Sequence, residues 1–218
     1  MSRDVQHLLR TLEAPRWRYR EFHARRAARR LPRHPISVAI ASVVRGAGRT
    51  TLTANLADVL ARTGLRVAAF ALDPEGMLPP LSRVTVVPFG AQPEQVLSDV
   101  ALLDLPAQPG PGALAEADEV LVVLRAGDDT AALESALGRL RPAWRRPPAR
   151  YLVNQFDARL PAHRAALRLL RARLGARLLE PPVQFEPHGG GLFPRESQAA
   201  HDVAAIARTL FPEGADAQ

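Results

Sequence analysis

The stretch VVRGAGRTT (Val43–Thr51) decides the fold, because it joins two segments of different character. Before it, PISVAIAS (35–42) is a short apolar run that is typical of a buried strand. After it, LTANLADVLARTG (52–64) has the apolar spacing of a helix. A glycine-rich turn between a strand and a helix points backbone N–H groups inward, and the helix N-terminus adds a partial positive charge. The stretch therefore predicts a phosphate-binding loop.

This loop departs from the usual pattern, which is Gly, any four residues and then Gly-Lys-Ser/Thr. Val43 replaces the first glycine, and the end of the loop reads Gly48-Arg49-Thr50. Gly46 and Gly48 still permit a tight backbone path, and Thr50 stands where a hydroxyl would hold Mg²⁺. The Arg49 guanidinium can bind phosphate through two N–H groups, but it is larger than a lysine ammonium. A glycine-rich turn without a ligand is the alternative interpretation.

The composition limits the class of protein. The 218 residues suit one domain with a full hydrophobic core, and the absence of cysteine excludes disulfides, thiolate metal sites and a cysteine nucleophile. All 29 basic residues are arginine, so Arg49 in place of a lysine partly reflects a preference of the whole chain. No apolar run reaches the ~18–20 residues of a membrane-spanning helix. The arginine-rich start also lacks the apolar core of a signal peptide, so we expect a cytoplasmic protein.

The net charge is concentrated at the N-terminus. Residues 1–34 contain ten arginines against Asp4, Glu13 and Glu21, a balance of +7, which equals the formal net charge of the whole chain. Such a segment suits an anionic lipid surface, nucleic acid or an acidic partner. A solvated arginine-rich helix explains the same pattern without any partner.

From Ile36 onward, strand-like and helix-like segments alternate. This order predicts an α/β fold: a three-layer, mostly parallel, doubly wound sheet. We divide the chain into a basic helical segment (1–34), the P-loop domain (35–212) and a frayed tail (213–218), and the Pro/Gly-rich connection 105–117 is too short for a good helix. The predicted strands are 36–42, 66–72, 83–88, 99–104, 118–124, 149–154 and 177–184. The predicted helices are 50–63, 128–140, 160–173 and 197–210.

Polar side chains end three of the predicted strands. Asp73 follows the second strand in FALDPEG, Asp104 ends another in VALLDLP, and Asn154 ends a later one in RYLVNQFD. The carboxyl ends of strands line the ligand crevice of an open α/β sheet, so these side chains are expected beside the loop. The two aspartates suit a Mg²⁺ shell or a water-orienting role, and the amide suits contact with a base edge. Each residue taken singly is an ordinary strand-end or turn residue.

These segments together resemble the ParA/MinD-type P-loop NTPases over residues 36–211. The resemblance lies in VRGAGRTTLTANLADVLARTGLRVAAFALDPEG (44–76), VTVVPFG (84–90), ALLDLPAQPG (101–110), ADEVLVVL (117–124) and NQFDARL (154–160). Within that family, VRG in the loop, PFG before the Asp104 strand and NQFD followed by LGARLL are similar to the BcsQ-type proteins of bacterial cellulose-synthesis operons. Residues 4–22 also look like short segments encoded in those operons.

The resemblance implies an ATP- and Mg²⁺-dependent homodimer that attaches to the cellulose synthase complex at the inner membrane and supports its assembly or placement. It implies that Asp73 positions the attacking water as the catalytic residue, that Thr50 and Asp104 hold Mg²⁺, and that Asn154 contacts the base. The implied phosphate-binding residues are Arg45, Gly46, Ala47, Gly48, Arg49, Thr50 and Thr51.

The chain departs from the family pattern at several points. The second lysine of the family falls on Val44, with Arg45 as a candidate replacement, and Ala71 replaces the first acid of the usual DxDP pattern. Only 30 residues separate Asp73 from Asp104, and the region 184–196 is short. Hydrolysis needs positioned charge in the transition state, so we expect a site that binds nucleotide better than it hydrolyses it.

Two alternatives remain open from the sequence. The first is a ParA/MinD-type positioning ATPase for another cargo, in which the basic arm touches nucleic acid. This alternative is disfavoured, and nucleic acid as a partner with it, because such proteins need efficient turnover and this loop is poorly suited to it. The second is a nucleotide-free scaffold that has kept the NTPase fold.

Overall fold

The computed structural model describes residues 35–90, 96–107, 109, 114, 117–127, 138, 149–187 and 191–212. The predictions for the segment 1–34 and the tail 213–218 lie outside these residues. So do those for the helix 128–140 and the connection 105–117, except for a few described residues within each.

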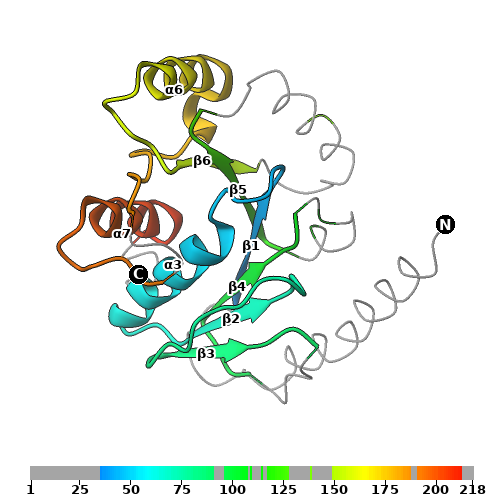
Figure 1. The fold of residues 1–218 in the computed structure, drawn as a ribbon. Helices are drawn as coiled ribbons and strands as arrows, with labels where there is room; N and C mark the ends of the chain where they lie inside the picture. The colour runs from blue at the N-terminus through cyan, green and yellow to red at the C-terminus, as the bar shows by residue number, and fades with distance from the viewer. Residues whose placement is uncertain are drawn as a thin grey trace.

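A parallel sheet of six strands forms the centre of the molecule, in the order β3-β2-β4-β1-β5-β6 (Figure 1). All five strand pairings are parallel, which confirms the predicted doubly wound sheet. Most strand residues are buried, as expected for strands that read as continuous apolar runs and are covered on both faces. The strands are β1 (Ile36–Ser42), β2 (Val67–Ala71), β3 (Val84–Val87), β4 (Val100–Asp104), β5 (Glu119–Arg125) and β6 (Arg150–Asn154).

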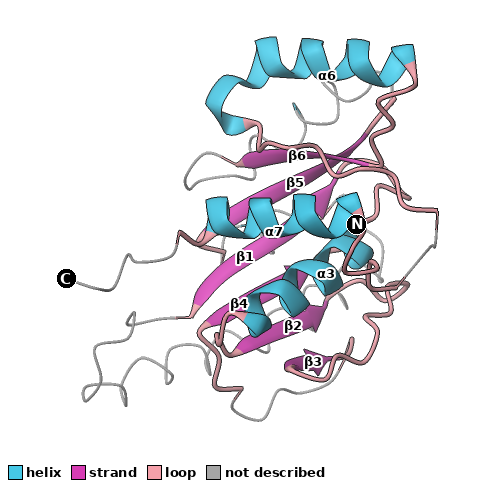
Figure 2. Cartoon of the chain, turned by 90° about the vertical axis from the view of Figure 1, so that its left-hand side faces the viewer, coloured by secondary structure: helices cyan, strands magenta, loops and turns pink. Residues whose placement is uncertain are grey.

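Helices cover the two faces of the sheet and bury two apolar clusters. The helices α3 (Arg49–Arg62) and α7 (Gln198–Leu210) lie beside each other on one face, where their apolar side chains meet alternate residues of β1 such as Val38 and Ile40 (Figures 1 and 2). The helix α6 (Pro161–Leu174), followed by the short helix η2 (Gly175–Arg177), packs near β6 against the other cluster. These helices agree with three of the four predicted from the sequence.

The predicted strand 177–184 is wrong. This segment meets β6 and its end only through isolated bridges at Leu178 and Gln184, with backbone hydrogen bonds from Leu179 and Val183 to β6. Between these contacts stands the pair Pro181-Pro182 (181–182), and proline has no N–H to donate to a neighbouring strand. The run is apolar enough for a strand, but its prolines interrupt the ladder.

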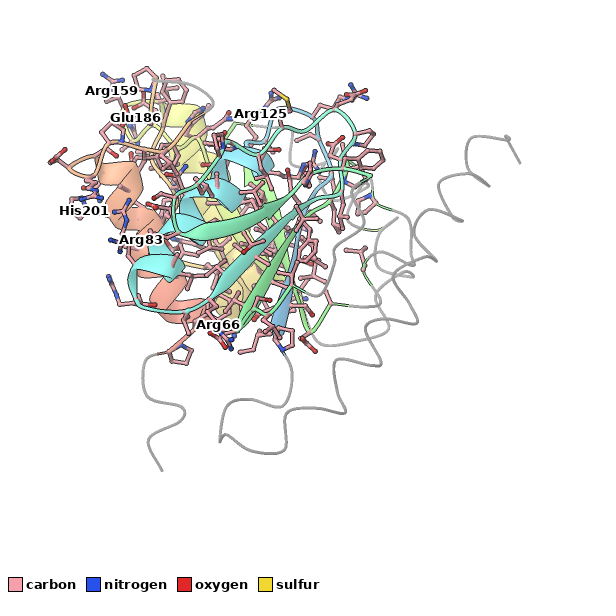
Figure 3. The ribbon with its side chains drawn as sticks, turned by 90° about the horizontal axis from the view of Figure 1, so that it is seen from below. Arg66, Arg83, Arg125, Arg159, Glu186 and His201 are labelled. Carbon is pink, nitrogen blue, oxygen red and sulfur yellow. The ribbon has the colours of Figure 1, made fainter. Side chains whose placement is uncertain are left out.

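The register of the sheet places the predicted site residues together at the carboxyl ends of the strands. Asp104 lies opposite Ile40 of β1 and Ala71 of β2, and Asn154 lies opposite Arg125 of β5. Figure 3 shows Arg125 at this end of the sheet, and Arg66, which precedes β2, at the opposite end. The order of strands reverses at β1, which is where open α/β sheets bind ligands.

In the parts of the chain that the structure describes, no helix has both the length and the apolar character needed to cross a bilayer.

Candidate nucleotide site

The segment Val43–Thr51 forms a tight turn between β1 and α3. Gly46 and Gly48 have φ angles of 74° and 81°, in the left-handed region that favours glycine. Gly48 is the N-cap of α3 without a side-chain hydrogen bond, and the first turn of α3 contains no acidic residue. The N–H groups at the start of α3 and the positive end of its dipole are therefore free of a competing carboxylate from the helix itself.

Two side chains that follow β6 hold this loop from one side. Nδ2 of Asn154 donates to the carbonyl of Ala47 at 2.8 Å, and Nε2 of Gln155 donates to the carbonyl of Gly46 at 2.8 Å. Asn154 is buried, and a Cβ built on Gly48 would lie 2.4 Å from its Nδ2. The loop therefore depends on glycine at position 48 and on both amides for its shape.

Sequence reasoning missed Gln155. Its φ of 58° is the one positive value among the described non-glycine residues, and such strain persists where surrounding contacts enforce it. NQFD contains this residue, but the sequence singles out only Asn154 as a strand-end amide. Asn154 donates one of its two amide N–H groups to the loop, and its contact with a base stays a prediction.

Thr50 and Asp104 meet at the base of the site. The Thr50 hydroxyl donates to Oδ2 of Asp104 at 2.6 Å, and Asp104 is fully buried. Its other oxygen, Oδ1, has no hydrogen-bond partner among the described residues. Burial raises the pKa of Asp104, the Thr50 hydrogen bond and the charge of Arg49 oppose that rise, and the charge of Asp73 adds to it. A hydroxyl and a buried carboxylate with a spare oxygen are the kind of ligands that Mg²⁺ takes from a protein beside nucleotide phosphates.

Arg49 lies against Asp73 on the side of the loop away from β6. Nη2 of Arg49 donates to Oδ2 of Asp73 at 2.8 Å, and the two side chains are only 10% and 14% exposed. The other terminal nitrogen, Nη1, is buried without a partner among the described residues. A buried guanidinium N–H group without a partner is costly, and an anion in the site would relieve that cost.

The remaining residues considered for phosphate binding, at positions 44, 45 and 51, present no unpartnered buried polar side-chain atom to the site. Val44 packs against both apolar clusters, so no charge stands where the family has its second lysine. Arg45 is largely exposed and pairs with Glu75 at 2.9 Å. Thr51 lies in the first turn of α3, where its carbonyl accepts from Asn55. The phosphate-binding role of these residues stays a prediction.

The donor set fits Mg²⁺ and a nucleotide phosphate. The fit rests on two unpartnered buried atoms from groups of opposite charge, Nη1 of Arg49 and Oδ1 of Asp104, and on the N-terminus of α3, which has no side-chain cap. One group attracts an anion and the other attracts a cation. A phosphate with its metal ion would supply both.

The raised pKa of Asp104 predicts a pH effect on the ligand-free protein. Between its ordinary value of 3.8 and the raised value, the folded protein binds more protons than the unfolded chain. The contribution of this group to stability is therefore present below pH 3.8 and is lost as the pH rises through the folded pKa. Asp104→Asn, which stays neutral, should exceed the wild type in free energy of unfolding by about 1 kcal/mol at neutral pH.

Urea unfolding of both proteins at several pH values checks this effect. The difference between Asp104→Asn and the wild type should grow with pH. A difference that stays constant with pH would show that Asp104 titrates normally.

Comparisons with known proteins identify the family. A family model described as the CobQ/CobB/MinD/ParA nucleotide-binding domain matches residues 38–186, and the chain belongs to this family. A search of curated proteins found no match.

Solved structures share the fold at low sequence identity. The chain is similar to the MinD cell division protein of Aquifex aeolicus, with a TM-score of 0.63 and 18% identity over 80% of this chain and 96% of that one. A plasmid partition protein of Borrelia burgdorferi bound to AMPPNP gives 0.64 and 14%, over 81% and 98%. Cobyrinic acid a,c-diamide synthase of Mycobacterium smegmatis with an ATP analogue and magnesium gives 0.61 and 20%, over 80% and 93%.

Proposed function

We propose that the chain binds ATP with Mg²⁺ at the loop between β1 and α3 and hydrolyses it weakly or not at all. The observation that carries this proposal is the pair of unpartnered buried atoms, Nη1 of Arg49 and Oδ1 of Asp104. They lie at the carboxyl ends of the central strands, where the strand order reverses. Relatives of the same fold are known with an ATP analogue and with ADP, each together with magnesium.

Each residue of the site has a proposed role. The loop from Arg45 to Thr51 receives the phosphates through its N–H groups and through Arg49. Thr50 and Asp104 hold Mg²⁺, which when bound offsets the negative charge of the phosphates. Asp73 orients the attacking water, and the side-chain amide of Asn154 contacts the base.

Weak hydrolysis follows from the arginine in the loop. Phosphoryl transfer depends on charges that are already in place around the transferred group. Arg49 donates to Asp73, so the cation of the loop and the proposed water-orienting carboxylate neutralise each other in this arrangement. Both groups have to rearrange before they can act on a phosphate, so turnover should be slow.

We further propose that the nucleotide-bound chain forms a homodimer that supports assembly or placement of the cellulose synthase complex at the inner membrane. Support comes from the segments VRG (44–46), PFG (88–90) and NQFD (154–157), which resemble the cellulose-operon branch of the family. The protein itself would stay cytoplasmic and reach the membrane through its partners. The basic segment 1–34 would meet anionic lipid or an acidic partner surface.

Thr50→Ala should weaken Mg²⁺-dependent binding of ATP at least about tenfold, because it removes a proposed metal ligand and the hydrogen bond to Asp104. Thr63→Ala, at the other end of α3, removes a hydroxyl that only bonds to the carbonyl of Leu60 and serves as the matched control. Titration calorimetry with and without Mg²⁺ measures both variants. Equal affinities of Thr50→Ala and wild type would contradict the metal assignment.

The cellulose role has a separate test. The tagged protein should co-purify with cellulose synthase subunits, and deletion of its gene should lower cellulose output. Absence of both effects would exclude this role without contradicting the proposed binding of nucleotide.

A positioning ATPase for another cargo is the second candidate function. It is favoured by membership of the family and by the shared fold with MinD and with a plasmid partition protein. The rate of ATP hydrolysis separates the two candidates. A positioning ATPase should release phosphate rapidly when its cargo is added, whereas a protein that supports assembly of cellulose synthase should retain ATP. A nucleotide-free scaffold would retain none.

A further inference from the structure

Two arginines of the loop are already paired with carboxylates that follow β2. We call residues 73–76 (DPEG) the acidic turn. Asp73 accepts a hydrogen bond from Nη2 of Arg49 at 2.8 Å, and Glu75 accepts one from Nη1 of Arg45 at 2.9 Å. The acidic turn therefore presents negative charge to the loop where the proposed phosphates would lie.

These two ion pairs differ in their shelter from water. The side chains of Arg49 and Asp73 are 10% and 14% exposed, whereas those of Arg45 and Glu75 are 80% and 68% exposed. Water and salt screen an exposed pair strongly and a sheltered pair much less. The contact between Arg49 and Asp73 is therefore the one that an incoming anion must overcome.

The acidic turn also lies directly on the proposed metal ligands. A Cβ built on Gly76 would be 3.3 Å from Oγ1 of Thr50 and 3.4 Å from Oδ2 of Asp104. The turn is closed on itself, because the N–H groups of Glu75 and Gly76 donate to the side chain and the carbonyl of Asp73, each at 3.0 Å. Moving Asp73 away from Arg49 thus moves the segment that covers the pair Thr50 and Asp104.

We propose that the acidic turn is an internal competitor for the phosphate site. In the structure Asp73 occupies Arg49 and the turn lies against Thr50 and Asp104, so a nucleotide loads only by displacing the turn. This inference rests on the proposed function and concerns the regulation of the same site. It makes Asp73 a group that opposes binding, in addition to its proposed role in hydrolysis.

Titration of the full chain with AMPPNP and Mg²⁺ tests the competition. Asp73→Asn removes the charge and should tighten the Kd about five- to tenfold. Asp73→Ser, a second replacement without the charge, should shift the Kd in the same direction. Both variants are compared with the wild type at the same ionic strength, after thermal unfolding has shown that each is folded.

Two controls separate the competition from a general loss of negative charge. Asp99→Asn changes the same residue type at the same side-chain exposure of 14%, in a pair with Arg66 at the opposite end of the sheet. Glu75→Gln removes the exposed charge of the acidic turn itself. Both should leave the Kd within about twofold of the wild type.

A double variant tests whether Asp73 acts through Arg49. In the Arg49→Ala background, Asp73→Asn should change the Kd less than about twofold, because the competing contact is already gone. If Asp73→Asn leaves the Kd of the wild type unchanged or raises it, the proposed competition is wrong, whereas the proposed function still stands. Absence of AMPPNP binding from the wild type and from every variant would overturn the proposed function, and the competition with it.

Discussion

Gly48→Ala abolishes nucleotide binding and lowers the free energy of unfolding by about 2–4 kcal/mol, which is the largest single effect we expect. The new Cβ would lie 2.4 Å from Nδ2 of Asn154 and 3.4 Å from Nε2 of Gln155. These atoms hold the carbonyls of Ala47 and Gly46, so they cannot withdraw without releasing the loop. The φ of 81° adds backbone strain for any residue with a side chain.

Gly64→Ala is the matched control for this variant. Gly64 follows the other end of α3 with a φ of 93°, and nothing lies within 4 Å of a Cβ built on it. Alanine there should cost only the backbone strain of about 1–2 kcal/mol and leave nucleotide binding intact. Urea unfolding and calorimetric titration measure both variants. Equal destabilisation by the two substitutions would show that the contact with Asn154 does not shape the loop.

Arg49→Ala raises the Kd for ATP with Mg²⁺ about ten- to hundredfold, the second large effect we expect. A hydrogen bond to a charged group contributes about 1.5–3 kcal/mol, and each 1.4 kcal/mol is a factor of about ten in affinity. Loss of the competing contact with Asp73 offsets part of this change, so the effect should lie toward the lower end of the range. The measurement is calorimetric titration with the slowly hydrolysed analogue AMPPNP.

Arg171→Ala serves as the control for Arg49→Ala. It removes the same side chain from a surface ion pair with Glu180, whose two partners are 52% and 43% exposed. Exposed pairs contribute little to stability, and this pair lies on α6 and the segment after η2, so the affinity should not change. Unchanged affinity in Arg49→Ala as well would show that Arg49 does not contribute to phosphate binding.

The sequence predicts the sheet and the end of the sheet at which the candidate residues lie, because both depend on local signals. Six of the seven predicted strands are apolar runs that the structure confirms to within about two residues. The parallel arrangement then follows from the alternation of strands and helices, and it brings Asp73, Asp104 and Asn154 to the same edge as the loop. The seventh predicted strand, 177–184, is wrong because Pro181 and Pro182 have no N–H groups to donate to a neighbouring strand, although the run is apolar.

The contacts between side chains could not be predicted in this way. Arg49 and Asp73 are 24 positions apart, and their pairing depends on how the segment after β2 folds back over the loop. Gln155 gave no signal of its own, because its function comes from a strained backbone angle and from a carbonyl 109 positions away. Local patterns determine which residues lie at the carboxyl ends of the strands, whereas tertiary packing determines which of their side chains form hydrogen bonds with one another.

ATP with Mg²⁺ should occupy the loop between β1 and α3 and stay there largely intact. The most direct test is native mass measurement of the purified full chain with and without ATP and Mg²⁺, followed by extraction and identification of the bound nucleotide. We predict a mass increase that requires Mg²⁺, a shift toward the dimer, and ATP in excess over ADP in the extract. An unchanged mass and an extract without nucleotide would contradict the claim.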